Sequence, residues 1–441
     1  MSIDQNYATK KIVKKTLFNI GFQVFPIAAA LLLTPYLINT MGKDSWAKYA
    51  TAISLVFLSN YFSFGLGPTL NRRVSELVGL KKFKIIREEL LECVSFSYLL
   101  GGFFFFLLQI AAYVAYEYGK FSILQNEGDY LFYALAVLIF LVAFLIIPFR
   151  SLLESFSDFY FLAIVRSSIS SMLFIVPAVY IYLFEISLFG ILLCLFLVYT
   201  SAYLIYLVRV QVYKRKFSFE TYPPYHIEFF KRIFGFETAF LKETFWFSIF
   251  FLASAMVLFF DRFYYPAFFD TKTIADHVTL LDLFNRIAIV TGTISLVYFS
   301  AISVWFQEKN LIRIKRNLKF QLLSVGFIFI GVLVFGNFFL ELILKWWLGS
   351  SYSTFITDNA YHLLIGVLLI NFTILLARPL QAIGQTRNVS IWLIATTIIY
   401  LGIVVFLGFR GIIQNHYVAF LVKGTLDLLI LILLSKRNKI L

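Results

Sequence analysis

The chain of 441 residues is 61% hydrophobic and 20% aromatic, and only 14% of its residues are charged. This composition and a mean hydropathy of +0.85 lie far outside the range of soluble domains. The formal net charge of +14 is typical of the cytoplasmic loops of a membrane protein, so we expect no nucleic-acid partner. The two cysteines lie in separate apolar stretches and predict neither a disulfide nor a zinc site.

Apolar runs along the chain predict twelve transmembrane helices, each of about 20 residues. The first run follows several lysines but is too long for the apolar core of a signal peptide, so we interpret it as an uncleaved helix. The predicted helices lie near residues 17–38, 50–70, 90–116, 130–149, 161–184, 186–208, 244–260, 274–300, 320–344, 360–377, 389–408 and 417–434. The sequence therefore predicts an all-α polytopic membrane protein.

Basic loops predict the orientation of these helices. With both termini in the cytoplasm, the cytoplasmic segments hold about 28 Lys and Arg residues and the outer segments about 7. We expect an N-lobe over 1–208, a basic cytoplasmic linker over 209–243 and a C-lobe over 244–441. A constant offset of 228 residues pairs Arg150 with Arg378 and Arg209 with Arg437. Because each lobe has six helices, the offset predicts two parallel repeats.

Motifs of common enzymes are missing from the sequence. It has no phosphate-binding G-x-x-x-x-G-K-[ST] segment, no H-E-x-x-H and no G-x-S-x-G. The predicted outer loops are too short for the acidic loop that a membrane glycan polymerase usually needs. The four histidines are scattered singly along the chain and favour structural roles; they are His226, His277, His362 and His416. We expect a transporter without a cofactor.

Ionisable residues inside the predicted helices are costly in lipid and are therefore candidates for function. Arg166 has no acidic residue one helical turn away, so either an anion or a carboxylate from another helix should neutralise it. Asp282 and Arg286 are four residues apart, as are Lys423 and Asp427. Each pair is either neutralised within its own helix or provides an aspartate for a coupling ion, which would be a proton or sodium.

Further candidates lie at or near the ends of helices. Asp261 and Arg262 end the seventh predicted helix near the outer face, where they could form a gate or an interfacial anchor. Asn19 and Gln23 lie one turn apart on one face of the first helix, which we expect to line a cavity. At the inner mouth of the second helix, Arg72 and Arg73 could capture an anion.

Several segments of the sequence resemble a known family of membrane proteins. They are PYLINTMGKDSWAKYA from Pro35, FGLGPTLNRRVSE from Phe64, DRFYY from Asp261, ADHV from Ala275 and PLQAIGQTR from Pro379. Together they resemble the Wzx-type O-antigen flippases of the multidrug/oligosaccharidyl-lipid/polysaccharide (MOP) exporter superfamily. The resemblance implies a MATE-like fold, in which two six-helix lobes surround a central cavity.

The resemblance also implies a cargo and a location. The cargo would be an undecaprenyl-pyrophosphate-linked oligosaccharide, moved by alternating access from the cytoplasmic to the periplasmic leaflet of the bacterial inner membrane. Membrane lipids and other glycan-assembly proteins are the expected partners. Arginine suits a phosphate headgroup because its guanidinium presents a planar fork of donors. Candidate contacts with the cargo are then Arg166, Arg286, Arg72, Arg73, Asn19, Gln23 and Lys423.

Two other functions stay open at this point. A cation-coupled exporter of drugs or small molecules could have the same fold, and an excess of buried acids over bases would favour it. Within the predicted helices, three bases against two aspartates favour an anionic cargo instead; they are Arg166, Arg286 and Lys423 against Asp282 and Asp427. A membrane glycan polymerase or acyltransferase is the remaining alternative.

Overall fold

The computed structural model describes residues 9–42, 65–117, 127–217, 238–265, 288–348 and 354–440, together with isolated positions between these ranges. Over these ranges the secondary structure is helical, with twelve α-helices that each overlap one predicted span. Nine helices in the described part are long and apolar enough to cross a membrane. The all-α, twelve-helix prediction is confirmed. The chain divides into two compact units, unit 1 (Met1–Phe245) and unit 2 (Trp246–Leu441).

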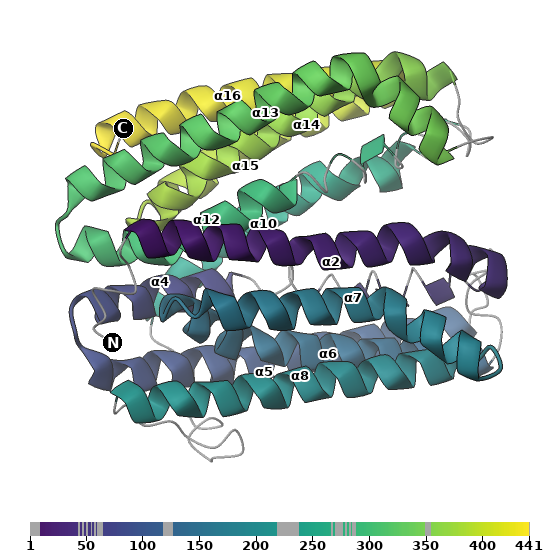
Figure 1. The fold of residues 1–441 in the computed structure, drawn as a ribbon, viewed down its shortest axis with the longest axis horizontal. Coiled ribbons are helices and arrows are strands. Elements are labelled where there is room, and N and C mark those ends of the chain that lie inside the picture. Colours follow the sequence, from purple (N-terminus) through teal and green to yellow (C-terminus); the bar gives the residue numbers. More distant parts are fainter. Residues whose placement is uncertain are drawn as a thin grey trace. The chain divides into compact units, whose positions relative to one another are not determined.

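Unit 1 is built around one central helix, α6 (Figure 1). This helix packs against α4, α5 and α8, while α2 packs along α7. The helices of unit 1 are α2 (Thr9–Met41), α4 (Leu66–Gly79), α5 (Ile86–Glu117), α6 (Glu127–Ser155), α7 (Phe159–Leu183) and α8 (Leu188–Phe217). The first residues of α10 (Thr238–Tyr264) complete the unit.

Unit 2 repeats this arrangement around α14, which packs against α12, α13 and α16. Tyr400 and Ser390 of α15 hydrogen-bond to backbone carbonyls of α10. The remaining helices of unit 2 are α12 (Ala288–Gln307), α13 (Leu311–Leu348), α14 (Thr354–Ala382), α15 (Thr386–Arg410) and α16 (His416–Arg437). Helix α14 in unit 2 therefore has the place that α6 has in unit 1.

The turns after α4 and α12 support the predicted repeat in atomic detail. Lys81 has a φ of 58° and Lys309 a φ of 56°, and the two lysines are separated by the offset of 228 residues. In both turns the same three consecutive backbone amides return to the end of the preceding helix. A left-handed conformation costs a residue with a side chain about 1–2 kcal/mol. Both turns nevertheless have lysine there.

Helices extend into both ends of the predicted linker over 209–243. Helix α8 continues to Phe217 and α10 begins at Thr238, whereas the predicted helices end at 208 and begin at 244. Residues 218–237, with the paired prolines, lie outside the described residues.

Gly366 of α14 lies where α16 approaches most closely, and it provides a test of this packing. A Cβ atom at Gly366 would lie 2.7 Å from Phe420 Cβ, whereas a Cβ at Gly402 of α15 meets nothing within 4 Å. We expect Gly366→Ala to destabilise the protein by about 1–3 kcal/mol through overpacking. Gly402→Ala, the matched control, should be neutral or stabilising. The thermal unfolding midpoint of the purified protein in detergent measures both, and equal midpoints would contradict this packing.

Candidate functional site

A buried carboxylate connects three helices of unit 1. Glu154, in the last turn of α6, forms an ion pair with Arg166 of α7. Its other oxygen accepts a hydrogen bond of 3.1 Å from the side-chain amide of Asn71 in α4. The Nε of Arg150, one turn earlier in α6, lies 3.8 Å from the first oxygen. Two guanidiniums and one amide thus share a carboxylate whose side chain is only 6% exposed.

The structure decides between the two alternatives for Arg166, because its partner is a carboxylate from another helix. Arg166 follows the first residue of α7 by seven positions, which places it about 10 Å along the helix axis. Its side chain is 20% exposed, and its Nε is buried without a hydrogen-bond acceptor among the described residues. The guanidinium is therefore neutralised but keeps a donor for a further acceptor.

Sequence reasoning missed Glu154 because the fourth predicted helix ends at residue 149, whereas α6 continues to Ser155. One signal was present in the sequence. Arg150 and Glu154 have the i,i+4 spacing at which oppositely charged side chains meet on a helix. Extending the helix by two turns would have placed Glu154 within reach of other helices.

Arg72 and Arg73 lie in a cluster of acids that joins α4 to α5 and to the start of α10. Arg72 pairs with Glu243 and, at 2.8 Å, with Glu76. Arg73 lies 3.1 Å from both Glu89 and Glu243. Burial lowers the pKa of Arg72, but the negative charges of Glu243 and Glu76 outweigh this, so the pKa lies above its ordinary value. Capture of an anion by this pair stays a prediction, and the anion would compete with carboxylates.

Asn19 and Gln23 lie on α2, which is attached to the turn between α6 and α7. The Asn19 side-chain amide donates to the carbonyls of Lys15, at 3.1 Å, and Phe159, at 3.3 Å. Lys15 is also buried, and its ammonium donates to the Ser157 carbonyl at 2.6 Å. Asn19 thus holds helices together, while Gln23 is half-buried. Their contact with a cargo stays a prediction.

In unit 2, the predicted pair of Lys423 and Asp427 closes within α16. The ammonium of Lys423 lies 2.8 Å from the Asp427 carboxylate and donates to the Thr396 hydroxyl of α15 at 3.1 Å. Thr396 in turn donates to the other carboxylate oxygen. The two charged side chains are 4% and 2% exposed. A coupling ion at Asp427 would therefore have to replace this ammonium.

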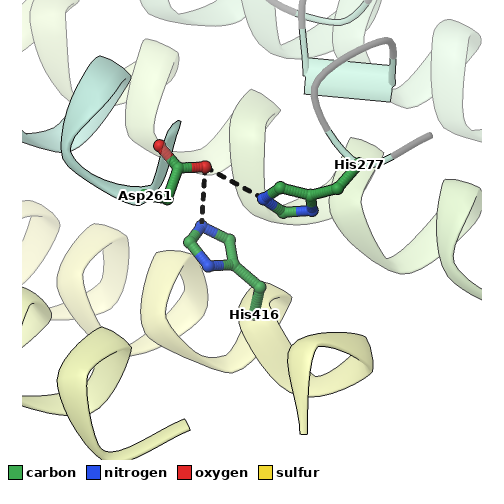
Figure 2. A group of neighbouring side chains, drawn as sticks. All are labelled: Asp261, His277 and His416. Atoms are coloured by element: carbon green, nitrogen blue, oxygen red, sulfur yellow. Dashed lines mark hydrogen bonds and ion pairs between the residues drawn. The ribbon is translucent and has the colours of Figure 1, made fainter. Parts of the chain in front are cut away.

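A second polar cluster in unit 2 contains Asp261 at the end of α10, His416 at the start of α16 and His277 from the segment between α10 and α12 (Figure 2). One oxygen of Asp261 lies 2.9 Å from His277 Nε2 and 4.0 Å from His416 Nε2. All three residues are buried. These two histidines, far apart in the sequence, lie side by side in the fold. The predicted gate or anchor role of Asp261 stays a prediction.

Several predicted site residues cannot be placed. Asp282 and Arg286 lie outside the described residues, as do His226 and the side chain of Arg262.

Comparison with known proteins identifies the fold. A Shigella flexneri protein named as an O-antigen transporter is 23% identical over 431 residues, which cover 95% of this chain and 96% of that protein. A MATE structure in complex with MaL6 superposes with a TM-score of 0.78, at 12% identity, over 97% of this chain and 95% of that chain. An outward-facing multidrug resistance MATE transporter of the MOP superfamily gives 0.71, at 13% identity, over 97% of each chain. No family model matches the sequence.

A third structure with this fold is a MOP superfamily transporter from Pyrococcus furiosus, with a TM-score of 0.74 and 14% identity over 97% of this chain and 95% of that chain. The chain therefore has the MATE-like fold implied by its resemblance to Wzx-type flippases. Fold and relatives indicate a multi-pass membrane transporter of the MOP superfamily and not an enzyme.

The buried pair in α16 gives a prediction about stability. Replacing Lys423 by Met leaves the Asp427 charge buried without its cation, and we expect a loss of about 3–5 kcal/mol. The double variant Lys423→Met, Asp427→Leu should recover most of this loss, because no charge remains. The exposed pair Glu341 and Lys345 has the same spacing and is 54% and 57% exposed.

Lys345→Met is the matched control and should cost less than about 1 kcal/mol. Thermal unfolding in detergent measures all three variants. A single variant at Lys423 as stable as the control would contradict the buried ion pair.

Proposed function

We propose that this protein is a flippase for a lipid-pyrophosphate-linked oligosaccharide, such as an O-antigen repeat unit. It would work in the bacterial inner membrane and move its cargo from the cytoplasmic to the periplasmic leaflet by alternating access. The relative named as an O-antigen transporter supports this cargo class, because the similarity covers nearly the full length of both chains. The observation that carries the proposal is the Arg166–Glu154 pair.

Arg166 has the properties that a pyrophosphate headgroup requires. It is a guanidinium within a helix of a membrane protein, it is partly exposed, and its Nε keeps an unused donor. Hydrogen bonds between arginine and phosphate are charge-assisted and often bidentate. A phosphate oxygen could therefore use the free Nε–H first and then replace Glu154 at the rest of the fork.

Glu154 can lose Arg166 without becoming an isolated buried charge. Its second oxygen would keep the hydrogen bond from Asn71, and Arg150 would stay 3.8 Å from the first oxygen. An uncompensated buried charge would otherwise cost several kcal/mol. In the proposed cycle, Glu154 therefore holds Arg166 while no cargo is bound and gives it to the headgroup during transport.

The two units supply the moving bodies for alternating access. Each unit has its own packed core around α6 or α14, so each can move as one body. Coupling to a proton or to sodium at Asp427 belongs to the proposal. Such an ion would have to displace the Lys423 ammonium, which already bonds to Asp427 and Thr396. Asp282 is the second proposed coupling site.

Export of surface glycan tests the role of Arg166. In cells whose own repeat-unit flippase is deleted, the wild-type chain should restore long surface glycan, measured on gels of extracted lipopolysaccharide. We expect Arg166→Ala to reduce this export by at least about 10-fold, because one charge-assisted contact of about 1.5–3 kcal/mol is lost. Arg166→Lys should restore it only in part, because an ammonium lacks the fork.

Arg410→Ala is the matched control, since Arg410 is an exposed arginine in the last turn of α15. It should export as the wild type does. Protein levels and thermal midpoints must match across the variants, because Glu154 keeps other partners when Arg166 is removed. Full export by Arg166→Ala would remove Arg166 from the cargo path. If purified wild-type protein in proteoliposomes moved no lipid-pyrophosphate oligosaccharide between leaflets, the proposed function would be wrong.

A further inference from the structure

We propose that Asp261, His277 and His416 bind a divalent transition-metal ion, such as Zn²⁺, inside unit 2. Each residue offers one ligand atom, and the three atoms lie within 4.8 Å of one another. All three residues are at least 99% buried. Two imidazoles and one carboxylate form a ligand set that suits zinc, cobalt or nickel, and the cluster contains no sulfur ligand that would favour Cu(I).

The spacing of the ligand atoms is close to that of a filled site. Zinc binds nitrogen and carboxylate oxygen at about 2.0–2.2 Å, so in a tetrahedral site neighbouring ligand atoms lie about 3.4 Å apart. The Asp261 oxygen lies 2.9 Å from His277 Nε2 and 4.0 Å from His416 Nε2, one value below and one above that spacing. Small shifts of the side chains would bring the three atoms to one ion, as their common orientation in Figure 2 shows.

The surroundings of His416 provide the support that a metal-binding histidine needs. A ligating imidazole usually donates its other N–H to a polar group, which fixes the orientation of the ring. His416 Nδ1 lies 2.7 Å from the Tyr265 hydroxyl, so Nε2 is free to bind the ion when Nδ1 carries the proton. His416 is also the first residue of α16, where the helix dipole disfavours an imidazolium.

His277 is likewise oriented with Nε2 toward Asp261, and its Nδ1 has no hydrogen-bond partner among the described residues. Metal binding would displace the proton shared between His277 Nε2 and Asp261, while the proton on His416 would occupy Nδ1. The ion would then connect the end of α10, the segment at His277 and the start of α16. This site and the Arg166 network share no residue, so the two proposals can fail separately.

Metal binding can be measured directly on the full-length protein, purified with a tag that contains no histidine and stripped with a chelator. We expect one Zn²⁺ per chain by elemental analysis after dialysis against micromolar zinc. Co²⁺ should give the visible absorption of a tetrahedral site, and zinc should raise the thermal midpoint. His277→Gln and His416→Gln should each lose the bound metal, the absorption and the rise in midpoint.

His362→Gln is the matched control, because His362 is an exposed histidine of unit 2 that stacks on Tyr417. It should bind metal as the wild type does. Tyr265→Phe tests the orientation of His416 in a variant that keeps all three ligands, and it should weaken zinc binding about 10–100-fold. The proposal is overturned if the wild type binds no zinc at micromolar concentration. It is also overturned if both His→Gln variants fold and still bind one zinc per chain.

Discussion

A charge within the membrane-spanning part of this chain has to be neutralised inside the protein, because lipid offers it no water. The described structure meets this constraint in three ways. Glu154 pairs with Arg166 across two helices, Lys423 pairs with Asp427 within one helix, and Asp261 lies against two imidazoles. Each solution fixes how neighbouring helices meet, so the same contacts that neutralise charge also hold the units together.

The number of helices could be predicted from the sequence because the requirement for them is local. A span needs about 20 apolar residues in a row, and that pattern is visible without any knowledge of packing. The Lys423–Asp427 pair could be anticipated for the same reason, since both residues lie one turn apart on α16. Local patterns thus account for the fold class and for one of the buried ion pairs.

Contacts between distant parts of the chain could not be predicted in this way. The acid beside Arg166 was expected only as an unnamed carboxylate from another helix, and it proved to be Glu154 beyond the predicted end of its helix. His277 and His416 seemed isolated because 138 residues separate them in the sequence. Only the packing of α16 against the end of α10 brings them to Asp261. Burial, which depends on tertiary packing, is what makes these residues candidates for function.

The two units share one packing scheme but differ in their polar residues. At the repeat offset, Glu154 corresponds to Ala382 and Arg166 corresponds to Ile394. The network that could receive an anionic headgroup is therefore restricted to unit 1, and the histidine cluster is restricted to unit 2. A common scaffold with separate chemistry allows one half to contact cargo while the other holds the residues proposed for ion binding.

The lysines in left-handed conformation after α4 and α12 have a consequence for the origin of the chain. Glycine would adopt this backbone angle with less strain, yet Lys81 and Lys309 share both the angle and the residue type. Independent evolution of the two turns would have little reason to arrive twice at the less comfortable amino acid. Tandem duplication of an ancestral gene for six helices, followed by divergence, leaves this kind of trace.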